Sequence, residues 1–380
     1  MSELDEFYMA RALQLAERGL YTTQPNPRVG CVLVGDGEII AEAWHQRAGE
    51  DHAEIIALAK LSGSVQGITA YVTLEPCSHQ GKTGPCCDAL ISAGVTRVVA
   101  AMQDPNPLVA GRGFERMRQA GIEVEFGIME ALARALNPGF VKRMETGLPY
   151  VRVKLAMSVD GRTAMNSGES QWITGSVARS DVQKLRARSS AIITGVGTVL
   201  LDDPSMTVRA EQLDLPLGTH LDADDVVKRQ PLRVVLDTHY RTPAAAKIVS
   251  LPGTTWVVGA VADVPEAIGN AVLKDIADTA GKVDLQAVLK ELAAHDCNEV
   301  LVEAGAVLSG AFLQAGLVDE MVIYMAPKLL GHTARPLMAL PGLEHMADQV
   351  ELSIADVRSV GDDWRINAIV RNPHKLALVE

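Results

Sequence analysis

One short part of the chain concentrates the side chains that a zinc ion prefers as ligands. His52 is followed two positions later by Glu54, and two Pro-Cys pairs place Cys77 and Cys86 downstream. Three protein ligands that leave a fourth coordination position open are typical of a catalytic zinc site rather than a structural one. The chain must therefore fold so that one imidazole and two thiols meet, with the Glu54 carboxylate free to move protons.

The elements predicted around these residues explain how the ligands can meet. Strands are predicted over 29–34, 38–44, 70–74, 96–102 and 122–126, and helices over 4–20, 52–61, 85–93 and 113–119. Asp51 is a good N-cap for a helix starting at His52, and Pro85 suits the first turn of the next helix. Two helix N-termini would then direct their positive ends toward the metal, which lowers thiol pKa values. After one hairpin, strands and helices alternate, which predicts an α/β layer with a largely parallel sheet.

A second series of strands and helices is expected to begin near residue 150. Residues 137–149 contain two prolines and two glycines and indicate a linker between two domains, 1–147 and 148–380. The acidic stretch 211–230 is predicted to be an irregular surface insertion. Further strands are predicted over 151–157, 191–196, 232–236, 255–258, 299–302 and 320–325.

Composition narrows the classes of partner and compartment. A formal net charge of −12 argues against a nucleic-acid partner, although local Arg and Lys residues can still bind a small anionic substrate. The acidic N-terminus lacks the apolar segment of a signal peptide, and no apolar run reaches the length that spans a membrane. Five cysteines, three of them close together, indicate a metal site in a reducing cytoplasm and not a disulfide framework.

The metal motif and four later segments together resemble one known family. The His-x-Glu and Pro-Cys elements resemble the zinc deaminase signature, although the gap between the two cysteines is longer than usual. The segment 76–86, Pro-Cys-Ser-His-Gln-Gly-Lys-Thr-Gly-Pro-Cys, resembles the deaminase half of the bifunctional riboflavin-biosynthesis deaminase/reductase family. Residues 153–162, 167–174, 195–204 and 302–305 are similar to the reductase half of that family.

The resemblance implies a fold for each half. The N-terminal half would be a cytidine-deaminase-like three-layer domain with a mostly parallel sheet, and the C-terminal half a dihydrofolate-reductase-like α/β domain that uses NADPH. An ordinary Rossmann site is not indicated, because no G-x-G-x-x-G follows a predicted strand.

The resemblance also implies two reactions. The first half would use one zinc ion per chain to deaminate 2,5-diamino-6-ribosylamino-4(3H)-pyrimidinone 5′-phosphate. The second half would use NADPH to reduce the ribosyl group of that product to ribityl, which gives 5-amino-6-(5-phosphoribitylamino)uracil. The implied partner is thus a small pyrimidine ribose phosphate, with no nucleic acid and no membrane, and a homo-oligomer is an option because family members are often oligomeric.

Individual residues receive roles on the same basis. Asn26 corresponds to a substrate contact of the deaminase half, and His45 and Lys82 are further candidates for its pocket. The expected cofactor contacts of the reductase half are Ala156, Trp172, Thr198, Asp202, Thr238, Gly305, Ala306, Val307, Leu308, Ser309, Gly310 and Ala311. The expected substrate contacts of that half are Ser170, Arg186, Met206, Arg209 and Glu303. The two arginines suit the role physically, since a guanidinium pairs bidentately with a phosphate.

Three alternatives stay open at the level of sequence. Cys87 or His79 could occupy the fourth coordination position and make the zinc site structural. A nucleic-acid or free-nucleoside deaminase with an appended binding domain would need a positive surface near the zinc, and arginines in 112–118 form the local basic cluster. A zinc-stabilised scaffold without catalysis would have no use for Glu54.

Overall fold

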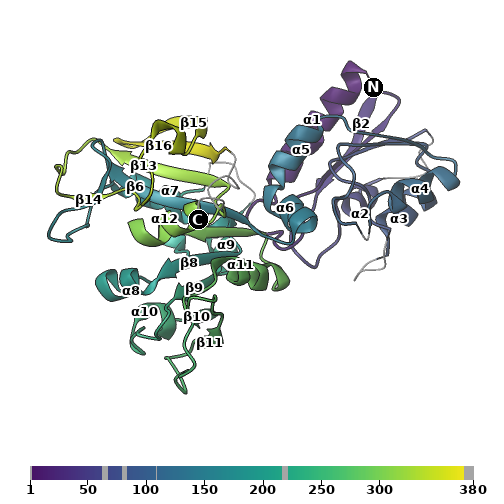
Figure 1. Cartoon of the computed structure of the whole chain (residues 1–380). Helices are drawn as coiled ribbons and strands as arrows, with labels where there is room; N and C mark the ends of the chain where they lie inside the picture. Colours follow the sequence, from purple (N-terminus) through teal and green to yellow (C-terminus); the bar gives the residue numbers. More distant parts are fainter. Residues whose placement is uncertain (1, 62–66, 79–83, 108, 216–220, 372–380) are drawn as a thin grey trace. The chain divides into compact units, whose positions relative to one another are not determined.

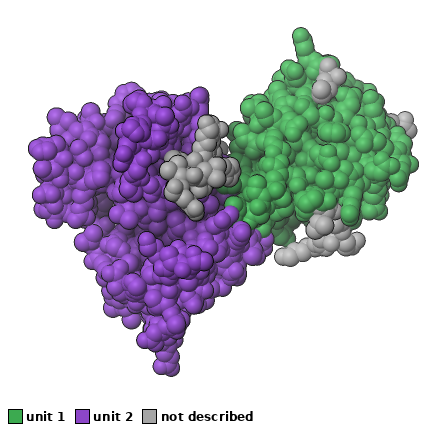
Figure 2. All heavy atoms as spheres, in the orientation of Figure 1, with its two compact units in different colours: residues 1–148 green, residues 149–380 purple. Residues whose placement is uncertain are grey.

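The chain divides into two compact units, residues 1–148 and residues 149–380 (Figure 2). The computed structural model describes residues 2–61, 67–78, 84–107, 109–215 and 221–371. Among the described helices, none combines the length and the apolar composition that crossing a lipid bilayer requires. Each unit has its own central sheet and is described separately below.

A five-stranded sheet forms the centre of unit 1, with the strand order β2-β1-β3-β4-β5. β1 pairs antiparallel with β2 and β3, whereas β3, β4 and β5 are parallel. The predicted hairpin followed by alternating strands and helices is therefore confirmed. The strands are β1 (Gly30–Gly35), β2 (Glu38–Trp44), β3 (Thr69–Val72), β4 (Arg97–Ala100) and β5 (Glu123–Phe126).

Helices cover both faces of this sheet, which gives the three layers that the family resemblance implies (Figure 1). One face packs on α1, α5 and α6, and the other on α2, α3 and α4. In β1, Val32 faces the first layer while Cys31 and Leu33 face the second, as the two-residue period of a strand requires. The helices are α1 (Glu3–Glu17), α2 (Ala53–Leu58), α3 (Cys86–Ser92), α4 (Arg112–Gln119), α5 (Glu130–Leu136) and α6 (Pro138–Thr146).

The prediction of a linker over 137–149 is wrong for most of that stretch, because α6 occupies it. Pro138 lies in the first turn, where a missing N–H removes no helical hydrogen bond, and Gly147 ends the helix with a φ of 72°. Val141 is buried against the sheet side of unit 1. Prolines and glycines that suggested a linker are the start and stop signals of a packed helix.

A nine-stranded sheet forms the centre of unit 2, with the order β11-β10-β9-β8-β12-β6-β13-β16-β15. All neighbouring strands from β11 to β13 are parallel, and β16 pairs antiparallel with both β13 and β15. The parallel strands are β6 (Tyr150–Ser158), β8 (Ala191–Gly195), β9 (Leu232–Leu236), β10 (Thr255–Gly259), β11 (Val272–Asp275), β12 (Glu299–Val302) and β13 (Glu320–Ala326). The C-terminal hairpin of β15 (Leu352–Val360) and β16 (Asp363–Val370) is not among the predicted strands.

Shorter elements complete unit 2. β7 (Arg162–Ala164) and β14 (Arg335–Pro336) form a separate two-stranded sheet. The helices are α7 (Ser176–Arg188), α8 (Val196–Asp202), α9 (Ala223–Val227), α10 (Lys247–Ser250), α11 (Leu285–Ala294) and α12 (Ala306–Gln314).

The stretch predicted as an irregular insertion, 211–230, is more ordered than expected in its described part. It contains α9, whose Val226 is buried, and the Gln230 side chain hydrogen-bonds to both the N–H and the C=O of Val208. These contacts hold the stretch against the segment that precedes it. Its acidic residues therefore do not make the whole stretch irregular.

Gly30 provides a test of the packing between α1 and the sheet. A Cβ at this position would lie 2.0 Å from the carbonyl oxygen of Ala12 and 3.0 Å from the backbone nitrogen of Ala16. Because both atoms belong to the helix backbone, Gly30→Ala should lower the free energy of unfolding of unit 1 by about 1–3 kcal/mol or more. Denaturant titration measures this change. Gly84→Ala is the matched control, since a Cβ there has no neighbour within 4 Å; an equal loss in both variants would contradict the packing argument.

Candidate functional site

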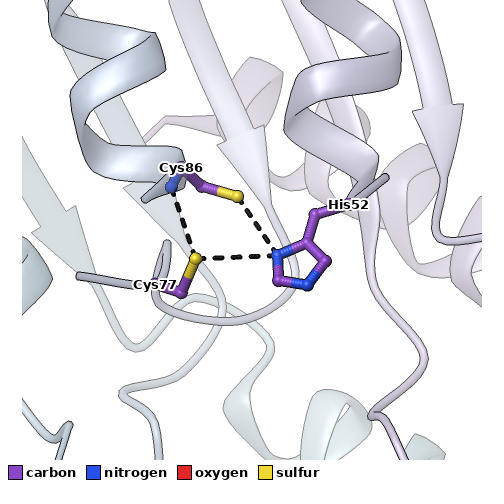
Figure 3. A group of neighbouring side chains, drawn as sticks. All are labelled: His52, Cys77 and Cys86. Atoms are coloured by element: carbon purple, nitrogen blue, oxygen red, sulfur yellow. Dashed lines mark hydrogen bonds between the residues drawn. The ribbon is translucent and has the colours of Figure 1, made fainter. Parts of the chain in front are cut away.

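His52, Cys77 and Cys86 meet at one point in unit 1 (Figure 3). The Nδ1 atom of His52 lies 3.2 Å from the Sγ of Cys86 and 3.6 Å from the Sγ of Cys77. The candidate ligand atoms all lie within 4.8 Å of one another, and no other such group occurs among the described residues. One nitrogen and two sulfurs around a common point suit tetrahedral zinc with one position left open.

Two helices begin at this cluster. His52 is the N-cap of α2, and Cys86 is the first residue of α3 after its N-cap, Pro85. The expected N-cap was Asp51, but the extended backbone at His52, with a ψ of 162°, moves the cap one residue on. In a regular helix, side chains two positions apart point away from each other. Because the backbone at His52 is extended and that at Glu54 is helical, both side chains can point to the same site.

The loop that carries Cys77 is held from two sides. The backbone N–H of Cys86 donates to the Cys77 sulfur at 3.3 Å, and the N–H of Cys87 donates to the Cys77 carbonyl at 3.2 Å. On the other side, the buried carboxylate of Glu75 accepts the N–H groups of Gly111 and Gly113, each at 2.9 Å. Glu75 was not among the predicted residues. The one hint in the sequence is its position, because an acidic residue stands directly between an apolar strand and a Pro-Cys pair.

Electrostatics at the cluster favour a thiolate. The Cys86 thiol and the His52 imidazole both stabilise the charged form of Cys77 and lower its pKa to about 4. Burial raises the pKa of Glu54 to about 6, while the His52 charge opposes that effect. Glu54 is 3% exposed and the Cys86 thiol stabilises its charged form, so its carboxyl group lies against the cluster.

Cys87 does not join the three candidate ligands. Its side chain is buried in the hydrophobic core cluster between the sheet and α2 to α4, and its thiol donates to Asp88. The other residue considered for the fourth position, His79, lies outside the described residues, as does the pocket candidate Lys82.

His45 lies beside the cluster, and the Asn26 side chain contacts His45. The Asn26 Nδ2 is 3.1 Å from the His45 Nε2, and the His45 Nδ1 is 3.0 Å from the carbonyl oxygen of Asp51. A carbonyl accepts only, so Nδ1 carries the proton and Nε2 accepts from the amide. The rings of His45 and His52 are 5.4 Å apart, and burial lowers the pKa of His45, which keeps this imidazole neutral.

A cavity of about 1880 Å³ lies in unit 2. It opens where the parallel strands β8, β9 and β12 end, which is where ligands bind in sheets of this kind. Its lining includes Ala156, Ser170, Trp172, Arg186, Thr198, Asp202, Met206, Arg209, Thr238, Glu303, Gly305, Ala306, Val307, Leu308 and Ala311, all of which the sequence singled out.

Two of the expected cofactor contacts do not line this cavity. Ser309 is fully buried and donates to the carbonyl of Ala304, while a Cβ on Gly310 would lie 2.0 Å from the carbonyl oxygen of Ala339. Both residues lie on the face of α12 that packs against the rest of unit 2. Residues about two positions apart on a helix point in nearly opposite directions, so one helix cannot present a continuous stretch of residues to one cavity. The continuous stretch assigned to the cofactor is thus interrupted.

Charged groups at one end of the cavity form a buried cluster. The Arg186 guanidinium donates to both oxygens of Glu303, at 2.6 and 3.0 Å, and the Lys154 Nζ lies 3.8 Å from the same carboxylate. Burial raises the pKa of Glu303, but the two cations outweigh it and the pKa is lowered. Burial also lowers the pKa of Lys154. Lys154 was not predicted; its sequence signal is a lysine within the apolar strand β6.

Arg209 differs from Arg186 in having no carboxylate within salt-bridge distance among the described residues. Burial and the neighbouring Arg186 both lower the pKa of Arg209, and the more distant carboxylates of Glu211 and Glu303 only partly oppose this. Its backbone N–H donates to the buried side chain of Gln183 at 3.1 Å, which holds this segment at the cavity wall. A guanidinium that lines a cavity without a direct carboxylate partner is suited to bind an anion.

Two helix N-termini also face the cavity. Gly305 is the N-cap of α12 and Gly195 the N-cap of α8, and neither has a side-chain cap. Their first-turn N–H groups are therefore available to the phosphate oxygens of a dinucleotide. Trp172 lies at the cavity wall, and the Arg179 guanidinium is 4.4 Å from the centre of its ring. Together they offer an aromatic face and a positive charge, which suit contact with a cofactor ring.

Family models match both halves of the chain. Residues 2–102 match the cytidine and deoxycytidylate deaminase zinc-binding region, and residues 149–366 match the RibD C-terminal domain.

Curated relatives and solved structures match over nearly the whole length. The riboflavin biosynthesis protein RibD of Escherichia coli K12 is 54% identical over 94% of this chain and 97% of its own length. A structure of Acinetobacter baumannii RibD is 47% identical, with a TM-score of 0.89 over 97% of this chain and 99% of that chain. A Thermotoga maritima deaminase/reductase structure is 31% identical, with a TM-score of 0.83 over 97% of this chain and 99% of that chain. The chain therefore belongs to the riboflavin biosynthesis protein RibD family.

Proposed function

We propose that the two activities of this bifunctional riboflavin-biosynthesis enzyme are divided between its two units. Residues 1–148 act as the zinc-dependent deaminase and residues 149–380 as the NADPH-dependent reductase. The observation that supports this division is that a His-Cys-Cys cluster lies in the first unit and the large cavity with open helix N-termini in the second.

In the first unit, His52, Cys77 and Cys86 act as the zinc ligands. When bound, zinc supplies the Lewis acidity that makes water a nucleophile near neutral pH. Glu54, buried against the cluster, accepts a proton from the attacking water and delivers it to the departing amino group. The ring C–N bond breaks and a C=O bond forms, so one water enters and one ammonia leaves. The Asn26 amide contacts the pyrimidine edge, and the substrate is 2,5-diamino-6-ribosylamino-4(3H)-pyrimidinone 5′-phosphate.

In the second unit, the chain binds and orients two reactants. NADPH, when bound, supplies the reducing equivalents that convert the ribosyl group to ribityl and give 5-amino-6-(5-phosphoribitylamino)uracil. The N-termini of α8 and α12 contact the cofactor phosphates, together with the cavity-lining residues assigned above, without Ser309 and Gly310. Arg209 binds the substrate phosphate, while Arg186, Glu303 and Lys154 contact the sugar end of the substrate.

A cytoplasmic location fits the thiol chemistry of the chain. None of the five cysteines forms a disulfide, and two of them have to stay reduced to act as metal ligands. A homo-oligomer, which the family resemblance implies, stays a prediction that sedimentation or light scattering can test.

Glu54→Gln tests the proton-transfer role. The amide keeps the size of the side chain but cannot accept and return a proton, so ammonia release should fall by roughly 10²- to 10⁴-fold. Zinc content, measured by elemental analysis, should stay at one ion per chain. Undiminished ammonia release would contradict the role of Glu54, and loss of zinc together with activity would indicate a structural role instead.

Cys77→Ser tests the ligand set and the independence of the two units. The variant should lose zinc and deamination while it retains NADPH oxidation on pre-deaminated substrate. Cys87→Ala is the matched control, because this neighbouring thiol lies in the core and outside the cluster. If Cys87→Ala lost zinc as Cys77→Ser does, the proposed ligand set would be wrong, and loss of both activities in folded Cys77→Ser would contradict separate sites.

Arg209→Gln tests the phosphate contact in the reductase cavity. Hydrogen bonds to a charged group contribute about 1.5–3 kcal/mol, so kcat/KM of the reduction should fall by roughly one to two orders of magnitude, mainly through KM. Arg358→Gln is the control, since Arg358 lies exposed on β15 and does not line the cavity. A KM unchanged in Arg209→Gln would assign the phosphate to another group.

A further inference from the structure

Asn137 joins two segments of unit 1 that lie 109 positions apart in the sequence. Its Oδ1 accepts the backbone N–H of Arg28 at 2.8 Å, and its Nδ2 donates to the carbonyl oxygen of Arg28 at 2.9 Å. Asn137 is 5% exposed and Arg28 is 6% exposed, so this two-bond clamp is shielded from water. The side chain thus pairs with both polar backbone groups of one residue, as a neighbouring strand would do.

The clamped residue belongs to the loop that carries Asn26. This loop, Pro25-Asn26-Pro27-Arg28, contains two prolines, which have no N–H to donate. Arg28 therefore offers a backbone donor that the prolines lack, and Asn137 binds it. The clamp comes from the junction of α5 and α6, in the stretch that the sequence suggested to be a linker.

A series of hydrogen bonds continues from this loop to the metal cluster. The Asn26 amide donates to His45, and the proton on His45 Nδ1 is donated to the carbonyl of Asp51. Asp51 immediately precedes His52, the N-cap of α2 and candidate zinc ligand. The Asn26 amide is therefore held on one side by His45 and on the other through the backbone that Asn137 clamps.

We propose that Asn137 is a positioning residue for deamination, which holds the 25–28 loop so that the Asn26 amide meets the pyrimidine edge at the zinc site. The inference rests on the proposed function of unit 1. A displacement of about 1 Å in a substrate-positioning group reduces rates by about 10²-fold, so a loosened loop should be visible in kinetics without loss of the metal.

A double-mutant cycle with Asn26 separates this role from a general effect on stability. Asn137→Ser should lower kcat/KM for ammonia release by roughly 10²-fold in the native background. In the Asn26→Ala background the same substitution should change kcat/KM by less than about threefold, because the group that it positions is already absent. Zinc content and NADPH oxidation on pre-deaminated substrate should stay unchanged in all four proteins.

Two further variants keep the test decisive. Asn137→Gln keeps both the acceptor for the Arg28 N–H and the donor to the Arg28 carbonyl on a side chain one methylene longer, so it should show a smaller loss than Asn137→Ser and serves if Asn137→Ser is unstable. Asn367→Ser, at a hydrogen-bonded asparagine of unit 2, is the control and should leave ammonia release unchanged.

The outcomes are distinct. Equal losses in the native and Asn26→Ala backgrounds, or no loss in either Asn137 variant, would overturn the positioning role. A native chain that binds zinc but releases no ammonia would overturn the proposed function first, and this inference with it.

Discussion

Unit 1 is organised around one geometric requirement, that an imidazole and two thiols meet at a single point. The ligands are up to 34 positions apart in the sequence, yet their donor atoms lie within 4.8 Å of one another. Two helix starts and one strand-end loop satisfy the requirement, because only at helix starts can side chains diverge from helical spacing while N–H groups stabilise thiolates. The hydrogen bonds from Glu75, Cys86 and Cys87 then hold that loop.

Unit 2 binds its ligands by a different principle. Its cavity is built where parallel strands end, and it combines open helix N-termini with guanidinium groups, which both attract phosphate. The buried charge of Glu303 is offset by Arg186 and Lys154, whereas Arg209 has no such carboxylate among the described residues. This asymmetry separates the two cations that neutralise Glu303 from the one that is available to the phosphate of an anionic substrate.

Where prediction from sequence and structure differ, the differences have local causes. Proline and glycine in 137–149 were interpreted as a linker, but the same residues also begin and end α6. β15 gave no clear signal, because most of it is exposed and its apolar spacing is irregular. β16 was missed although Trp364, Ile366, Ala368 and Val370 alternate along it as a strand requires. Ser309 and Gly310 were assigned with their neighbours, and only the packing of α12 shows that they face away from the cavity.

The sequence by itself determined the chemistry of the chain: one nitrogen, two sulfurs and a carboxylate for a zinc site, and glycines and arginines for a phosphate-bearing cofactor and substrate. Donor chemistry belongs to the residue type, so it can be recognised before folding is known. The tertiary structure alone decided that Asn137 clamps the Asn26 loop, that Lys154 faces Glu303, and that Cys87 is buried away from the cluster. These facts depend on which distant segments pack together, and no local pattern in a single chain encodes that.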